Sequence, residues 1–192
     1  MGRRVEKKYE HGTHIAEFVE EMPLLAEDRK TIFLPDTDID KAIALGGRTL
    51  GIMLASIMRP LAEKFGDEVW EVAKQAMYQI GRRRAASLAR LMKINDLKDA
   101  RCLGRIMDIE DNNSGVKGEW IETGKKRAVK HEYECPLVCP QLEKCPQVCS
   151  ILLEAMEEGT FDELGVRVKK PLITKVIPSG DPYCEVVVEL EE

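Results

Sequence analysis

Four cysteines crowd one short segment of the sequence, the run CPLVCPQLEKCPQVC that extends from Cys135 to Cys149. Three of them precede a proline, and a residue before proline is kept out of the helical region, so the chain bends and thiols close in sequence can converge. Soft thiolates bind Zn²⁺ or iron–sulfur clusters in a reducing compartment. The segment therefore predicts a metal centre, zinc or iron–sulfur, with Cys135, Cys139, Cys145 and Cys149 as ligands.

The spacing of these cysteines leaves other interpretations open. It is neither the two-residue knuckle of zinc ribbons nor a standard ferredoxin run. Pro146 suits the first position of a helix, which would place Cys145 at the N-cap and Cys149 one turn inside, where the helix N-terminus favours a thiolate. Buried core thiols and disulfides are the alternatives to a metal site.

Two further segments contain residues that could carry chemistry. Read as a strand, the segment before Cys135 places His131 and Tyr133 on the same face as Cys135, and Glu132 on the other. Near the C-terminus, Cys184 leads a row of alternating apolar residues and should lie at the mouth of whatever the sheet covers. Each of these side chains is also compatible with ordinary packing, and His131 is more often a core or rim histidine than a ligand or base.

Other motifs are weak. The arginines of Arg82–Arg84 could bind a phosphate or a carboxylate, although a solvated helix face is the commoner outcome. The sequence contains no GxSxG, Walker, HExxH or dinucleotide-binding motif, so it gives no sign of the enzymes that use them.

Helices should dominate the first half of the chain. Apolar residues recur at helical spacing from Ile39 to Phe65, with Pro60 near the end of that stretch. Gly46, Gly47 and Gly51 weaken the helix intrinsically, so we expect another backbone to approach it closely. Gly66 should end this helix and Asp67 should cap a second one that ends near Asn95. A short helical turn over 96–101 should follow.

Strands should dominate the second half. Alternation predicts strands over 103–110, 116–122 and 127–135, a helix ending near Glu158, and a C-terminal hairpin over 172–177 and 183–190. The fold class expected is α+β, with an N-terminal helical layer packed on an antiparallel sheet and a helix inserted before the C-terminal hairpin. Residues 1–35 should form an arm, and residues 36–192 a single α+β ligand-binding-like domain.

Composition restricts the function classes. The chain has 192 residues, 44% of them hydrophobic and 33% charged, with a net charge of −5. This balance argues against wholesale binding of nucleic acid or of an anionic membrane. No stretch reads as a membrane span, and the N-terminus lacks the apolar region of a signal peptide, so a cytoplasmic location is expected.

The C-terminal half resembles the L-2-amino-thiazoline-4-carboxylic acid hydrolase family. The residues that carry the resemblance are His131-Glu-Tyr-Glu-Cys135-Pro, the cysteines that follow, and Gly180-Asp-Pro-Tyr-Cys184-Glu-Val-Val-Val. The family is similar to four-vinyl-reductase-type ligand-binding domains and, more remotely, to haem-NO-binding and transport-particle domains. The resemblance covers residues 38–192 and implies helices on an antiparallel sheet, with a small-molecule pocket between them. Cys184, Tyr133 and His131 should border that pocket.

The resemblance also implies a metal site. Relatives of the ligand-binding type use a Glu-x2-Cys…Cys zinc site, whose pattern Glu132 and Cys135 match, whereas the spacing of Cys145 and Cys149 departs from it. Zinc and an iron–sulfur cluster remain equal alternatives as the cofactor.

Two functions follow from these expectations. The first is a metal-binding, small-molecule-binding protein that could hydrolyse a C=N bond in a cyclic substrate, with Cys184 and His131 as the catalytic candidates. The second is a sensor or accessory module containing a metal or a cluster, because a closed four-cysteine site leaves no open coordination position. The expected partners are a small ligand or substrate, and either a second copy of the chain or a larger complex.

Overall fold

The computed structural model describes residues 39–191. The chain divides into two compact units, Met1–Ile39 and Asp40–Glu192. The arm expected over 1–35 lies outside the described residues.

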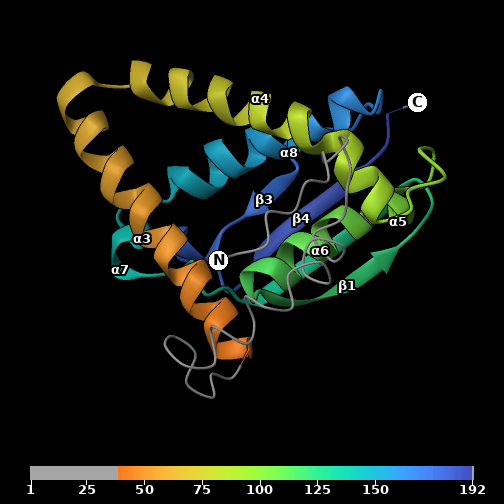
Figure 1. The fold of residues 1–192 in the computed structure, drawn as a ribbon, viewed down its shortest axis with the longest axis horizontal. Coiled ribbons are helices and arrows are strands. Elements are labelled where there is room, and N and C mark those ends of the chain that lie inside the picture. Colours follow the sequence, from red (N-terminus) through yellow and green to blue (C-terminus); the bar gives the residue numbers. More distant parts are fainter. Residues whose placement is uncertain (1–38, 192) are drawn as a thin grey trace, which may run out of the picture. The chain divides into compact units, whose positions relative to one another are not determined.

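Two long helices open the described chain, as their apolar periodicity predicts (Figure 1). Helix α3 spans Ile39–Phe65 and helix α4 spans Glu68–Leu91. Gly66 separates them with a φ of +74°, a left-handed conformation that glycine adopts without steric cost, and Asp67 takes the N-cap position of α4. The boundary expected from Gly66 and Asp67 is therefore confirmed.

The glycines of α3 permit the close approach expected of them. A Cβ atom at Gly51 would overlap the main-chain oxygen of Leu137, and one at Gly47 would lie 2.5 Å from the main-chain oxygen of Ser114. Gly46, by contrast, faces open space. The middle turns of α3 thus pack against Ser114 and the loop that follows Cys135 because Gly47 and Gly51 lack side chains.

The strand expected over 103–110 is wrong, because this segment is helical. Helix α5 spans Ala100–Leu103 and α6 spans Arg105–Ser114. The buried residues of this segment, Leu103, Ile106 and Met107, are three and four positions apart, as in a helix. The same sequence also alternates between apolar and polar residues as a strand would, so both patterns fit it. The Asp99 side chain accepts a hydrogen bond from the Arg101 amide at 3.0 Å and so caps α5.

The sheet has four antiparallel strands in the order β1-β2-β4-β3. The strands are β1 Lys117–Thr123, β2 Arg127–Glu134, β3 Ile173–Lys175 and β4 Cys184–Glu189. Between β2 and β3 come a short helix α7, Pro140–Glu143, a π-helical turn η1, Val148–Leu153, and helix α8, Glu154–Glu163. A 3-10 turn η2, Ile177–Ser179, joins β3 to β4. The α+β class with a helix before a C-terminal hairpin is confirmed.

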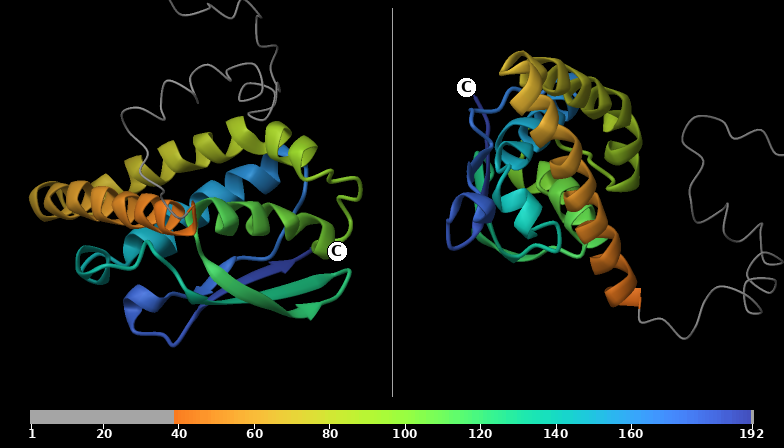
Figure 2. Two further views of the ribbon diagram at one scale, coloured as in Figure 1. Left: turned by 60° about the horizontal axis from the view of Figure 1, so that its bottom comes forward. Right: turned by 90° about the vertical axis from the view of Figure 1, so that its left-hand side faces the viewer.

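The helices cover one face of the sheet (Figure 2). Helix α4 crosses α8 at two glycines: a Cβ atom at Gly81 would overlap the main-chain oxygen of Met156, and one at Gly159 would overlap that of Tyr78. The two backbones therefore approach as closely as packed helices can. Glu157 lies on α8 next to this crossing. The close approach of the two helices brings its side chain within reach of residues on α4.

Helix α3 is attached along one side and leaves apolar side chains exposed on another. Leu50, Met53, Ile57, Leu61 and Phe65 are 44%, 55%, 54%, 37% and 56% exposed, and we call them the α3 stripe. At about 3.6 residues per turn they fall within roughly a third of the helix circumference. By length and composition alone the helix could cross a membrane, with a mean hydropathy of 1.3, which differs from the expectation that no segment reads as a span.

Candidate ligand cavity

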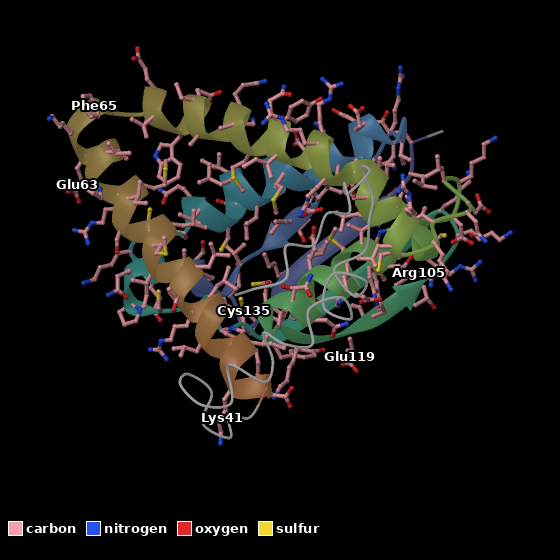
Figure 3. The ribbon with its side chains drawn as sticks, in the orientation of Figure 1. Lys41, Glu63, Phe65, Arg105, Glu119 and Cys135 are labelled. Atoms are coloured by element: carbon pink, nitrogen blue, oxygen red, sulfur yellow. The ribbon has the colours of Figure 1, made fainter. Side chains whose placement is uncertain are left out.

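A cavity of about 320 Å³ lies between the helices and the inner face of the sheet. Its walls are mostly apolar, with Met107, Leu137, Leu153, Met156 and Val186 among them. Three thiols, five charged side chains and two neutral polar ones also line it: Cys135, Cys149, Cys184, Arg84, Glu110, Asp111, Glu132, Glu157, Asn113 and Ser114. Figure 3 labels Cys135 next to α3, and its side chain is half-buried. The volume falls at the lower end of the range of small-ligand sites.

Three chain segments bring the thiols to this cavity. Cys135 follows the end of β2, Cys149 lies in η1, and Cys184 opens β4, where it is buried in one row with Val186 and Val188. Burial raises the pKa of the Cys135 thiol to about 11 and that of Cys184 to about 12, and it raises the pKa of Cys149 as well. All three are therefore neutral thiols at physiological pH and poor nucleophiles.

The four clustered cysteines do not converge on one point. Cys139 and Cys145 are buried in the apolar core with Leu142, and only Cys135 and Cys149 line the cavity. Over residues 39–191, no group of three or more His, Cys, Asp or Glu side chains is arranged to hold a metal ion. The expectation of a metal-binding function is therefore wrong, whereas zinc or an iron–sulfur cluster as the cofactor, with Cys135, Cys139, Cys145 and Cys149 as its ligands, stays a prediction.

His131 and Tyr133 lie on the outer face of the sheet, away from the cavity. His131 Nε2 is 2.8 Å from Glu185 Oε2, and its ring stacks on Tyr183 with 3.9 Å between centroids. The Tyr133 hydroxyl donates to Glu119 Oε1 at 2.9 Å. This placement differs from the expectation that both would border the pocket with Cys184, because the chain turns after Glu134 and Cys135 no longer follows the alternation of β2.

Glu132 takes the inner position instead. It pairs in register with Cys184 across β2 and β4, and its carboxyl group lines the cavity. No hydrogen bond or ion pair joins it to another residue in the described part of the chain. Burial, and then the charge of Asp111, raise the pKa of Glu132 to about 8, so the group is mostly protonated at neutral pH.

Arg84 anchors a buried polar network at the same end of the cavity. Its Nη2 donates to Glu157 Oε1 at 2.7 Å and its Nε to Thr160 Oγ1 at 3.1 Å, and its Nη1 pairs with Glu110. Burial and the neighbouring Glu157 charge raise the pKa of Glu110 well above its usual range. The arginines of Arg82–Arg84 were expected to form a solvated helix face or an anion site. Arg84 is instead enclosed by carboxyl groups, whereas Arg82 pairs with Glu163 at the surface.

A second cation is also fully engaged. Lys130, which is 4% exposed, lies 2.6 Å from Asp108 Oδ1 and 2.6 Å from Asp111 Oδ2, and its ammonium group lies 5.4 Å from the Trp120 ring centroid. Sequence reasoning missed Lys130, Glu110, Asp111 and Glu157 because charged residues in a helix or strand usually indicate solvent. The one available signal was the alternation of Ala128, Lys130 and Glu132, which share the inner face.

This geometry does not support hydrolysis. The cavity thiols are neutral, and His131, the base considered for the reaction, lies on the opposite face of the sheet. The arrangement can instead enclose an apolar group, with carboxyl groups at one end of the enclosure.

Comparisons with known proteins bear on the fold. No family model matches the chain, and no curated protein does. A solved structure is similar, that of a trafficking protein particle complex subunit 3 from Naegleria fowleri covalently bound to palmitic acid. The TM-score is 0.58 at 14% identity, over 77% of this chain and 96% of that one, which shows a shared fold. The resemblance to the thiazoline-carboxylate hydrolase family, and the hydrolase function drawn from it, are therefore corrected: the structural match is to a trafficking-complex subunit.

Proposed function

We propose that this protein is a structural subunit of a multiprotein complex, and that a second copy of the chain is its first partner. The observation that carries the proposal is the α3 stripe. The likeness to a trafficking protein particle complex subunit supports it, since that protein also works as part of an assembly.

The α3 stripe is unusual for a surface helix. A helix that is apolar on more than one side is normally covered on each of those sides. In α3 one side packs through Gly47, Gly51 and the buried Ala55 and Met58, while within residues 39–191 the stripe stays exposed, with Leu50 also at the edge of the cavity. Contiguous exposed apolar surface of this kind marks an interaction site.

A second copy suits the stripe because the stripe is self-complementary. An antiparallel pair of α3 helices with Ile57 on the two-fold axis would place Met53 of one copy opposite Leu61 of the other. A two-fold interface joins the same patch on both subunits, and interfaces within homodimers are more apolar than those of transient complexes. The five residues of the stripe are apolar, and Lys64, which lies on the same side of α3, would stand at the edge of such an interface.

The test is the mass of the full-length protein in solution, measured by sedimentation equilibrium. The expected mass is twice 21.7 kDa. Ile57→Glu should raise the dimer dissociation constant about 30-fold or more, the effect of losing a central contact worth about 2 kcal/mol. Ile121→Glu is the matched control, because Ile121 on β1 is 51% exposed against 54% for Ile57.

Either of two results would contradict the proposal. One is that the wild-type protein stays a monomer at all micromolar concentrations. A monomer that sediments with lipid vesicles through α3 counts as this result, because the stripe would then bind a membrane and not a second copy. The other is a dimer that Ile57→Glu and Ile121→Glu weaken equally, which would place the interface elsewhere.

The cavity favours a second function, binding of an alkyl chain. Its walls are largely apolar, three thiols lie in them, and the solved structure of similar fold holds palmitic acid covalently. Binding of octanol, which has a chain and no charge, tests this function by isothermal titration calorimetry. One molecule should bind per chain, and Val186→Trp, which fills the cavity, should abolish binding without unfolding the protein.

A further inference from the structure

We propose that the polar end of the cavity receives a primary ammonium group, so that the ligand of this site is an alkyl amine rather than a fatty acid, with Glu132 as the carboxylate that receives it. This inference rests on the proposed function of the cavity as a chain-binding site. It adds the chemistry of the ligand's polar end.

Acidic groups outnumber cations at that end of the cavity. Four carboxyl groups from α6 and α8 face Glu132: Asp108, Glu110, Asp111 and Glu157. The two cations are Arg84 on α4 and Lys130 on β2. With Glu132 there are five carboxyl groups against two cations. A ligand carboxylate would add a sixth acid to an enclosure that already has too few positive charges.

Neither cation is available to a ligand. Arg84 is shared among Glu110, Glu157 and Thr160, and Lys130 is held between Asp108 and Asp111. Nothing positive remains in the described lining to bind an anion. One acceptor in that lining remains without a partner, the Glu132 carboxyl group. Beside it Glu157, which is 4% exposed, shares a hydrogen bond with the Glu110 carboxyl group and keeps a buried oxygen, Oε2, that no cation reaches.

Bound protons help the site to balance its charge. Burial is the first cause that raises the pKa of Glu110, Asp111 and Glu132, and Glu132, with a pKa of about 8, holds a proton at neutral pH. An ammonium group can replace one of those protons. Binding would then release one proton from Glu132 to solvent, while R–NH₃⁺ takes its place beside the carboxylate and breaks no covalent bond.

The three thiols fit the same reading. Cys135, Cys149 and Cys184 face Glu132 and are neutral, because their pKa values are raised, so they add no charge to the site. They add soft, uncharged surface to the cavity lining. An amine with an alkyl chain matches both parts of the cavity.

The experiment compares three ligands of equal chain length, octylamine, octanol and octanoate, by calorimetry on the full-length protein. If only ionised Glu132 binds the amine, octylamine affinity should rise about 50-fold from pH 6 to pH 8, as expected for a carboxyl pKa near 8. Titration in two buffers of different ionisation enthalpy should show about one proton released per amine near pH 6.5. Octanoate should bind more weakly than octanol at both pH values.

Two variants identify the residue. Glu132→Gln should abolish both the pH dependence and the proton release while octanol binding is kept. Glu119→Gln, on the outer face of the sheet, should change neither. The circular dichroism melting curve of each variant confirms that it is folded.

The outcomes separate this inference from the function on which it rests. If octanol and octylamine both fail to bind, the chain-binding function is wrong and the inference falls with it. If octanoate binds as tightly as octylamine, or Glu132→Gln leaves the amine profile unchanged, the cavity still binds chains and the amine preference is wrong.

Discussion

Arg84 on α4 and Glu157 on α8 form an ion pair, with 2.7 Å between Nη2 and Oε1, and their side chains are only 22% and 6% exposed. The pair is possible because Gly81, one turn before Arg84, lets the two helices touch through their backbones. A buried pair of this kind costs free energy to desolvate, and removing one partner leaves the other charge uncompensated.

Replacing Arg84 should therefore destabilise the fold strongly. We expect Arg84→Met to lower the free energy of unfolding by about 3–4 kcal/mol at pH 7, because Glu157 loses its cation while it stays buried. Urea denaturation followed by circular dichroism measures the change. The control is Arg82→Met, which removes a surface pair with Glu163 and should cost less than about 1 kcal/mol. Equal effects of the two substitutions would show that the Arg84 network does not stabilise the fold.

The helix crossing should not tolerate a side chain. Gly81→Ala would drive a Cβ atom into the Met156 main chain, so the unfolding free energy should fall by about 2–3 kcal/mol. Gly46→Ala makes the same substitution where nothing lies within 4 Å, and should stabilise α3 by about 0.5–1 kcal/mol. Thermal melting of the two variants side by side measures this contrast. Similar melting temperatures would mean that α4 and α8 can separate without penalty.

Glu132 should make the protein less stable as the pH rises. Its pKa in the folded protein, about 8, lies above the ordinary value of 4.5, so the folded state binds more protons than the unfolded state between these values. The free energy of unfolding must then decrease with pH across that window. Glu132→Gln removes this dependence, and its stability advantage over the wild type should grow by about 2–4 kcal/mol from pH 5 to pH 8. Urea melts at both pH values test this, and an advantage that shrinks with pH would contradict the raised pKa.

The thiols of the cavity should react slowly. Burial keeps Cys135 and Cys184 protonated, with pKa values of about 11 and 12, so iodoacetamide at pH 8 should modify both at less than a tenth of the rate seen in urea. Mass spectrometry of peptides after timed alkylation gives the rate at each position. Octylamine, if it occupies the cavity, should slow both further, whereas Cys102 lies outside the cavity and should be unaffected. Rapid native labelling of Cys184 would show that the thiols are open to solvent.

Much of the fold could be predicted from local patterns. Gly66 followed by Asp67 marked the break between α3 and α4, and the alternation of β2 and β4 marked two central strands. The segment that became α6 could not be assigned in this way. Its apolar residues satisfy both a strand and a helix pattern, and burial against the sheet decides between them.

The cavity was harder to predict, since it depends on contacts distant in sequence. Four cysteines within one short run suggested one site, yet only Cys135 and Cys149 reach the cavity, where they join Cys184 from the last strand. Glu132 was placed on the wrong side relative to Cys135, because alternation holds only as far as the strand continues. Arg84 and Glu157 meet through two glycines on different helices, and no local pattern connects them.

The π-helical turn η1 has a consequence for how this chain can vary. A π turn closes its hydrogen bonds over five residues instead of four, so it holds one residue more than an α-helical turn of the same span. Deleting a single residue from Val148–Leu153 would let the turn relax to an ordinary helix continuous with α8. Every side chain before the deletion would then rotate by about 100° relative to α8, which would carry Cys149 out of the cavity wall. The position of Cys149 is therefore sensitive to the length of this segment. By an insertion or deletion here, related chains could gain or lose a thiol at the cavity without any substitution of the cysteine itself.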